Sequence, residues 1–255
     1  MIRLDIEASN LSNASVLSRI ARAVYADDAL GDFPFLEKSF DEIITFRGER
    51  VFGLVASDSR NVVMTFRGKD DDQQLAEFLA YSQTEWIEGR AHGGFVRLLN
   101  SVWERVLAAL YDAKEVKKTL WVTGHSVGGS LAILAAQRLV HEGFEPHMVV
   151  TFGAPRVLDP EAAKAFSVPL YRVINNEDAV PRLLWPTLFD TYADVGEEVF
   201  LLASGDVAEA RHSAHLARKL DRANHIGEGV LRAGPVHDHA IDEYLAKLGR
   251  YAKSS

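Results

Sequence analysis

The segment that decides the fold is TLWVTGHSVGGSLAILAA, at residues 119–136. Its first five residues are apolar or β-branched and predict a short buried strand. From Val127 to about His141 the chain is rich in alanine and leucine, which predicts a buried helix. The strand changes to the helix within the five residues GHSVG, so the sequence predicts a sharp turn with Ser126 at its apex.

The two glycines of this turn, Gly124 and Gly128, stand two residues before and two residues after the serine. So tight a backbone leaves no room for a side chain at either position. A serine at the start of a helix also lies beside unpaired N–H groups and the positive end of the helix dipole, which stabilise a developing negative charge. The sequence therefore predicts that Ser126 is a nucleophile activated by a neighbouring base.

The rest of the chain alternates between strand-like and helix-like segments. Further strands are expected at Ile43–Phe46, Val51–Ala56, Asn61–Phe66, His147–Phe152, Leu170–Ile174 and Glu198–Leu202, and further helices at 13–30, 94–111, 208–222 and 240–251. Such alternation predicts an α/β fold with a central, mostly parallel sheet flanked by helices. No linker-like stretch interrupts it, so a single domain over residues 1–255 is expected.

An acid and a base are expected after the serine, in that order, from loops that follow later strands. Asp178 stands just beyond the strand at 170–174, at the edge where the sites of open α/β sheets collect. Glu177 is the alternative acid. His237 and His239 precede the last helix, and His239 is favoured as the general base because the apolar face of that helix follows it directly.

Composition excludes several classes of protein. A net charge of −8 disfavours binding to nucleic acid, because that affinity comes from clustered lysine and arginine. The absence of cysteine excludes a thiol nucleophile and thiolate metal sites. Hydrolysis by an activated serine needs no metal or cofactor, so none is expected; a metal site built from His212, His215, His237 and His239 is the rival hypothesis. The N-terminal residues lack the pattern of a signal peptide, so a cytoplasmic protein is expected.

Six short motifs occur in a fixed order along most of the chain. They are VMTFRG at 63–68, HGGF at 92–95, GHSVGGS at 124–130, TFGAPR at 151–156, NEDAVP at 176–181 and DHAIDEY at 238–244. Together they resemble the motifs of the class 3, or fungal-type, lipase family of the α/β-hydrolase superfamily. The resemblance implies an α/β-hydrolase fold and a catalytic triad of Ser126, Asp178 and His239, and it strengthens the preference for His239 over His237.

One position departs from the resembled family on the side of the oxyanion. In that family a serine or threonine usually follows the FRG turn and contributes its N–H and its hydroxyl, whereas this chain has Lys69. The backbone N–H groups of Lys69 and Val127 are the expected oxyanion donors. Lys69 lacks the hydroxyl that would be a further donor. Loss of one oxyanion donor typically lowers turnover by about 10²–10³-fold, so modest activity is expected. His92-Gly93-Gly94 is a rival oxyanion loop, although a structural role at the entry to the next helix is favoured.

Two apolar segments are candidates for contact with the substrate. In the resembled family a lid helix occupies the interval that corresponds to 70–89, and its apolar face here would comprise Leu75, Phe78, Leu79 and Trp86. A helix packed permanently on the domain is an equally weighted alternative. The second segment, at 180–189, contains Leu184 and Trp185, which either line a groove for the acyl chain or belong to the core.

These features predict hydrolysis of triacylglycerols or other lipid acyl esters through an acyl-serine intermediate. The expected partners are a lipid or small-molecule ester and, transiently, a lipid surface, with no nucleic acid; the sequence specifies no oligomeric state. A short-chain carboxylesterase is the alternative enzyme. The departure at Lys69 motivates a third hypothesis, a weakly active or non-catalytic binding module on the hydrolase fold.

Overall fold

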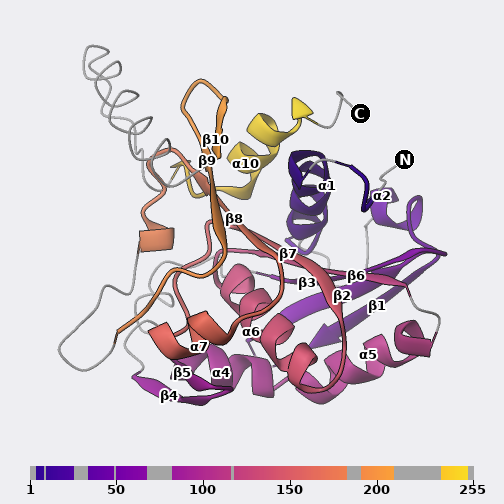
Figure 1. Ribbon diagram of the computed structural model, residues 1–255. Helices are drawn as coiled ribbons and strands as arrows, with labels where there is room; N and C mark the ends of the chain where they lie inside the picture. The colour runs from indigo at the N-terminus through magenta and orange to yellow at the C-terminus, as the bar shows by residue number, and fades with distance from the viewer. Residues whose placement is uncertain are drawn as a thin grey trace.

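The computed structural model describes residues 4–8, 10–25, 34–48, 50–67, 82–115, 118–182, 191–209 and 237–251 (Figure 1). Its centre is an eight-stranded sheet with the strand order β1-β2-β3-β6-β7-β8-β9-β10. These strands are β1 Glu42–Arg47, β2 Phe52–Ser57, β3 Asn61–Phe66, β6 Thr119–His125, β7 Pro146–Phe152, β8 Leu170–Asn175, β9 Glu197–Leu201 and β10 Val207–Glu209. Strands β3, β6, β7, β8 and β9 pair in parallel, whereas β1–β2, β2–β3 and β9–β10 pair antiparallel. The predicted mostly parallel sheet is confirmed, and antiparallel pairs lie at its two edges.

Helices cover both faces of the sheet (Figure 1). One face carries α4 Gly93–Asn100, α5 Trp103–Glu115 and α6 Val127–His141, and the other carries α1 Asn10–Ala23 and α10 Ile241–Leu248. Successive residues of the central strands alternate between the two cores: Met64 and Val122 pack with α4–α6, while Val63 and Trp121 pack with α1 and α10. Both faces of the sheet are therefore buried, as parallel strands require.

The remaining described elements lie around this framework. They are α2 Pro34–Glu37, α7 Pro160–Ala165, the 3₁₀ turn η1 Val180–Arg182, and a separate two-stranded sheet of β4 Gln83–Trp86 and β5 Gly89–His92. Within the ranges that the structure describes, no helix is both long enough and apolar enough to span a bilayer.

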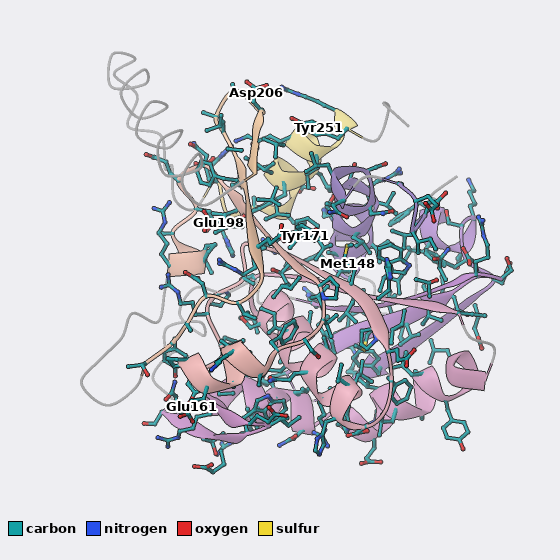
Figure 2. The ribbon with its side chains drawn as sticks, in the orientation of Figure 1. Met148, Glu161, Tyr171, Glu198, Asp206 and Tyr251 are labelled. Carbon is teal, nitrogen blue, oxygen red and sulfur yellow. The ribbon has the colours of Figure 1, made fainter. Side chains whose placement is uncertain are left out.

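Packing across the upper face fixes α1 and α10 over the strands that carry the site. Met148 and Tyr171 extend from β7 and β8 on this side (Figure 2), and Asn10, at the start of α1, donates a hydrogen bond of 2.6 Å to the Tyr171 hydroxyl. Near the other end of α1, Arg22 pairs with Asp242 of α10 at 2.8 Å. Helices α1 and α10 thus pack together on the same face of the sheet.

Two helix predictions need correction. The segment 94–111 does not form one helix, because α4 ends at Asn100 and α5 begins at Trp103. At the break the hydroxyl of Ser101 donates to the Leu98 carbonyl at 2.7 Å, a local side-chain bond that competes with continued helix. The start of the expected helix at 208–222 lies instead in β10, because residues 207–209 pair with β9; the rest of that segment lies outside the described residues.

Candidate active site

The turn between β6 and α6 has the sharp geometry that the glycines predict. Ser126 has φ 56° and ψ −130°, a strained conformation for any residue other than glycine. A Cβ on Gly124 would lie 2.2 Å from the Gly128 carbonyl oxygen, and a Cβ on Gly128 would lie 2.1 Å from the carbonyl oxygen of Phe66 on β3. The backbone segments are therefore so close that neither glycine can be replaced without moving the chain.

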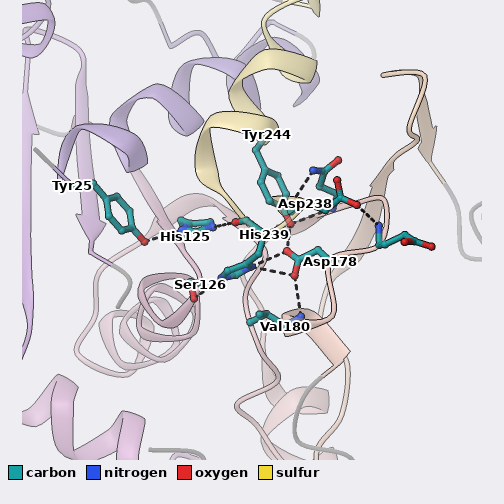
Figure 3. Close-up of polar contacts among 10 residues, drawn as sticks. Tyr25, His125, Ser126, Asp178, Val180, Asp238, His239 and Tyr244 are labelled. Carbon is teal, nitrogen blue, oxygen red and sulfur yellow. Dashed lines mark hydrogen bonds and ion pairs between the residues drawn. The ribbon is translucent and has the colours of Figure 1, made fainter. Parts of the chain in front are cut away.

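Ser126 is the N-cap residue of α6, but its side chain makes no capping hydrogen bond. Its backbone N–H donates to the Phe152 carbonyl at 2.9 Å, which fixes the turn against β7. The hydroxyl oxygen lies 2.9 Å from Nε2 of His239 (Figure 3). The serine is nearly buried, and its hydroxyl is directed at a base instead of the helix end.

His239 bridges Ser126 and Asp178. Its Nδ1 lies 2.9 Å from Oδ2 and 3.1 Å from Oδ1 of the Asp178 carboxylate. An ionised carboxylate only accepts hydrogen bonds, so Nδ1 carries the proton and Nε2 presents its lone pair to the Ser126 hydroxyl. The arrangement can withdraw the proton of the serine and hold the resulting imidazolium next to a negative charge.

Asp178 is completely buried, and two further groups besides His239 donate hydrogen bonds to its carboxylate. The N–H of Val180 donates to Oδ1 at 2.9 Å, and the hydroxyl of Tyr244 donates to Oδ2 at 2.5 Å. Burial, and secondly the charge of Asp178, raise the pKa of Tyr244 well above its usual value. Tyr244 therefore stays protonated and remains a donor. The sequence predicts no role for Tyr244 beyond its place in the motif at 238–244.

Hydrogen bonds between the loop after β8 and the loop before α10 distinguish Asp178 from Glu177 and His239 from His237. Asp238 accepts from the side-chain amide of Asn176 at 3.0 Å and from the backbone N–H of Glu177 at 3.1 Å. Asp178, and not Glu177, is the carboxylate bonded to the imidazole of His239. His237 is largely exposed and lies 3.3 Å from the Glu243 carboxylate on α10, so it points away from the serine.

On the oxyanion side, the structure describes one of the two predicted donors. Val127 is the first residue of α6, where the helix itself provides no acceptor for the N–H. Lys69 lies outside the described residues. His92 is the N-cap of α4, and its Nδ1 accepts from the Phe95 N–H at 3.4 Å, which confirms the structural role predicted for the HGG sequence.

Trp86 is not on a lid helix, contrary to the sequence prediction. It lies on β4, and its indole N–H donates to the side chain of Gln137 on α6 at 2.9 Å. Pairing with β5 gives this end of the 70–89 interval an extended conformation that helical periodicity did not reveal. The other lid candidates, Leu75, Phe78 and Leu79, lie outside the described residues, as do Leu184 and Trp185.

The metal hypothesis gains no support within the described ranges, where no three His, Cys, Asp or Glu side chains gather closely enough to bind an ion. Two of its four proposed ligands, His212 and His215, lie outside those ranges.

Sequence comparisons place these features among known lipases. A lipase of Caenorhabditis elegans is 36% identical over 141 residues, which make up 51% of this chain and 40% of that protein. A secreted mono- and diacylglycerol lipase of Fusarium solani is 36% identical over 157 residues, 58% of this chain and 46% of that protein. The chain thus spans less than half the length of these two curated relatives.

Structural comparison gives the fold over a larger part of the chain. The crystal structure of a lipase from Rhizopus microsporus var. chinensis superimposes with a TM-score of 0.69, covering 85% of this chain and 87% of that chain at 20% identity. The fold is therefore that of the α/β-hydrolases. Residues 62–187, which include Asp178 and the sharp turn at 124–128 (the elbow), match the family model for class 3 lipases, and the chain belongs to the class 3 lipase family.

Proposed function

We propose that this protein hydrolyses carboxylic esters of lipids, through an acyl-enzyme intermediate on Ser126. One observation carries the proposal: a buried hydroxyl, an imidazole and a carboxylate from three separate segments are joined in that order by hydrogen bonds. The names of the relatives, which include an acylglycerol lipase, support lipid esters as the substrate class.

In the proposed reaction, Nε2 of His239 removes the proton of Ser126 as its Oγ attacks the ester carbonyl carbon. The carbonyl oxygen becomes negative and is stabilised by the N–H groups of Val127 and Lys69. His239 then gives its proton to the departing alkoxide, which leaves as the alcohol. Water, deprotonated by His239, attacks the acyl-serine and releases the carboxylic acid, and the proton returns to Oγ.

Asp178 orients the imidazole and stabilises its positive charge in both tetrahedral steps, without itself taking the proton. The buried Tyr244 hydroxyl and the Val180 N–H each donate a hydrogen bond to the carboxylate and fix its direction. The three residues of the proposed triad thus come from the turn after β6, the loop after β8 and the segment before α10.

The decisive test is the variant Ser126→Ala, assayed on a series of acyl esters from short to long chains and on an emulsified triglyceride. Loss of a triad nucleophile should lower kcat by about 10³-fold or more. Ser59→Ala, in an exposed turn, is the matched control and should retain full activity. Full ester hydrolysis by Ser126→Ala would refute the proposal.

The ester series, reaction with an organophosphonate and treatment with a chelator separate the alternative functions. A lipase should gain activity when its substrate exceeds the solubility limit, whereas a short-chain carboxylesterase should prefer dissolved short esters. A binding module would leave Ser126 unreactive towards an organophosphonate that attacks activated serines. Unchanged activity in the presence of a strong chelator is expected, and loss of activity there would revive the metal hypothesis.

A further inference from the structure

Within the described residues 237–240, the segment that carries His239 makes few hydrogen bonds of its own. It is a short turn between His237 and α10, in which the Ala240 N–H donates to the His237 carbonyl at 3.0 Å. Ala240 is the N-cap of α10 and contributes no side-chain capping bond. The position of the base relative to Ser126 must therefore be set by contacts with other parts of the chain.

Two successive main-chain carbonyls of this segment accept hydrogen bonds from side chains of the sheet. The Asn175 amide donates to the Asp238 carbonyl at 2.9 Å, and Nε2 of His125 lies 2.6 Å from the His239 carbonyl oxygen. Asn175 is the last residue of β8, and His125 is the last residue of β6. The strands that present the acid and the nucleophile thus also hold the backbone of the base.

The contacts of His125 specify its tautomer. A carbonyl oxygen can only accept, so Nε2 carries the proton. Nδ1 then has a free lone pair and accepts from the hydroxyl of Tyr25, which lies 2.7 Å away (Figure 3). The Tyr25 ring is itself packed against the guanidinium of Arg67, 5.6 Å from the ring centre, at the end of β3. His125 therefore joins the end of α1 to the segment of the base.

The surroundings of His125 keep it neutral. Burial, and secondly the nearby His239, lower the pKa of His125 to about 3. The two imidazole centroids are 4.7 Å apart. Because His239 becomes positively charged during the proposed reaction, a neutral neighbour avoids repulsion that a second cation would impose.

We propose that His125 is a positioning residue, whose Nε2–H fixes the main-chain carbonyl of His239 and thereby the direction of its imidazole. The inference rests on the proposed function of Ser126 as the nucleophile. His125 does not touch the reacting atoms, and no proton passes through it. Its effect is on the alignment of the base, where an error of about 1 Å can cost about 10²-fold in rate.

The test compares His125→Phe, which keeps an aromatic ring but loses both nitrogens, with the unmodified protein. Prolonged reaction with an organophosphonate counts the competent serines, so kcat is expressed per titrated site. A merely structural role would lower the thermal midpoint and the number of titrated sites but leave this kcat unchanged. Misalignment of the base instead predicts a fall of about 10²-fold in kcat per site, with KM changed by less than about threefold.

Two milder variants keep the test decisive if His125→Phe does not fold. His125→Gln restores an N–H donor near the position of Nε2 and should recover part of the lost kcat. Tyr25→Phe removes only the hydroxyl that selects the tautomer, and a fall of about three- to tenfold is expected from the loss of one hydrogen bond.

A histidine outside the site provides the matched control. His147, on β7, packs its ring against Trp121 with centroids 4.8 Å apart. His147→Phe keeps a ring in that contact and should leave kcat per site unchanged. Imidazole ¹⁵N spectra of the unmodified protein should show His125, identified by its loss in His125→Phe, with a protonated Nε2 and a bare Nδ1 from about pH 5 to about pH 9.

Full kcat per site in His125→Phe, or in both milder variants if it does not fold, would overturn the inference, as would the opposite tautomer. These outcomes differ from failure of the proposed function. In that case Ser126→Ala would retain the activity of the unmodified protein, or the unmodified protein would hydrolyse no ester.

Discussion

The two halves of the candidate site are built in different ways. The nucleophile half is local: β6, the Ser126 turn and α6 are continuous in sequence, and the shape of the turn follows from close backbone contacts at Gly124 and Gly128. The acid–base half is assembled from distant segments. His239 and Asp178 are 61 residues apart in the chain and are joined by side-chain hydrogen bonds, and Tyr244 of α10 donates a further hydrogen bond to Asp178.

This difference has consequences for tolerance to mutation. In the local half, steric crowding permits almost no change at the glycines, and a substitution there should affect folding. In the distant half, each polar group contributes separately to the alignment of the base, so substitutions should give graded losses of activity. The four predictions below test that contrast.

The largest effect on activity is expected for Asp178→Asn. The amide would present a donor to Nδ1 of His239 and favour the wrong tautomer, so kcat should fall by about 10⁴-fold. Glu177→Gln is the control, because Glu177 meets Asp238 through its backbone N–H, and it should remain within about threefold of the unmodified protein. A greater loss in Glu177→Gln than in Asp178→Asn would reverse the assignment of the acid.

The largest effect on stability is expected for Gly128→Ala. The added methyl group would lie 2.1 Å from the Phe66 carbonyl oxygen, so the start of helix α6 must move away from strand β3. Denaturant unfolding should show a loss of about 3 kcal/mol or more. Gly143→Ala is the matched control: its Cβ would meet no atom within 4 Å, and only its φ of 80° costs energy, about 1 kcal/mol. Equal losses at the two sites would contradict the steric account of the elbow.

His125 should make the protein less stable as the pH falls. Its pKa is about 3 in the folded protein, against 6.5 for an ordinary histidine, so between these values the unfolded chain binds a proton that the folded protein does not. The stabilisation is complete above about pH 6.5 and declines by about 1.4 kcal/mol per pH unit below it. Unfolding of His125→Gln and of the unmodified protein, measured across this range, should differ by that slope. Parallel stability curves would disprove it.

A smaller and mixed effect is expected for Tyr244→Phe. The variant loses the donor to Asp178 and leaves the Asn175 N–H without the tyrosine oxygen as acceptor. Unfolding measurements should show a loss of about 1–3 kcal/mol, because two buried polar groups lose a partner. The Asp178 carboxylate keeps His239 and Val180, so kcat should fall by only about tenfold. Unchanged stability would mean that the tyrosine hydroxyl is not a structural part of this half.

The local sequence was sufficient for the elbow and for most of the sheet. Glycine spacing, the apolar strand and the apolar helix all act within about 20 residues, so the positions of Ser126 in the turn and of Val127 at the start of α6 can be predicted from sterics and periodicity. The acid followed from the same logic, because the end of β8 places Asp178 at the edge of the sheet where β6 also ends.

Tertiary structure alone decided the features that depend on distant partners. Local residues favoured His239 over His237 without settling the choice, but only the loop bonded to Asp238 shows which imidazole reaches the serine. Helical periodicity predicts a helix at Trp86, because the pairing between β4 and β5 leaves no signal in that periodicity. The break between α4 and α5 was likewise hidden within a continuous apolar pattern.

His125 shows most clearly the difference between what the sequence determines and what the tertiary structure determines. The sequence placed His125 inside the elbow, but its bonds to Tyr25 and to the His239 carbonyl span 100 and 114 residues. Sterics and periodicity are properties of neighbours in the chain and can be read there. Hydrogen bonds between distant segments form only when the folded sheet brings those segments together. The local geometry of Ser126 therefore follows from the sequence, whereas the alignment of His239 with Ser126 follows from the tertiary structure.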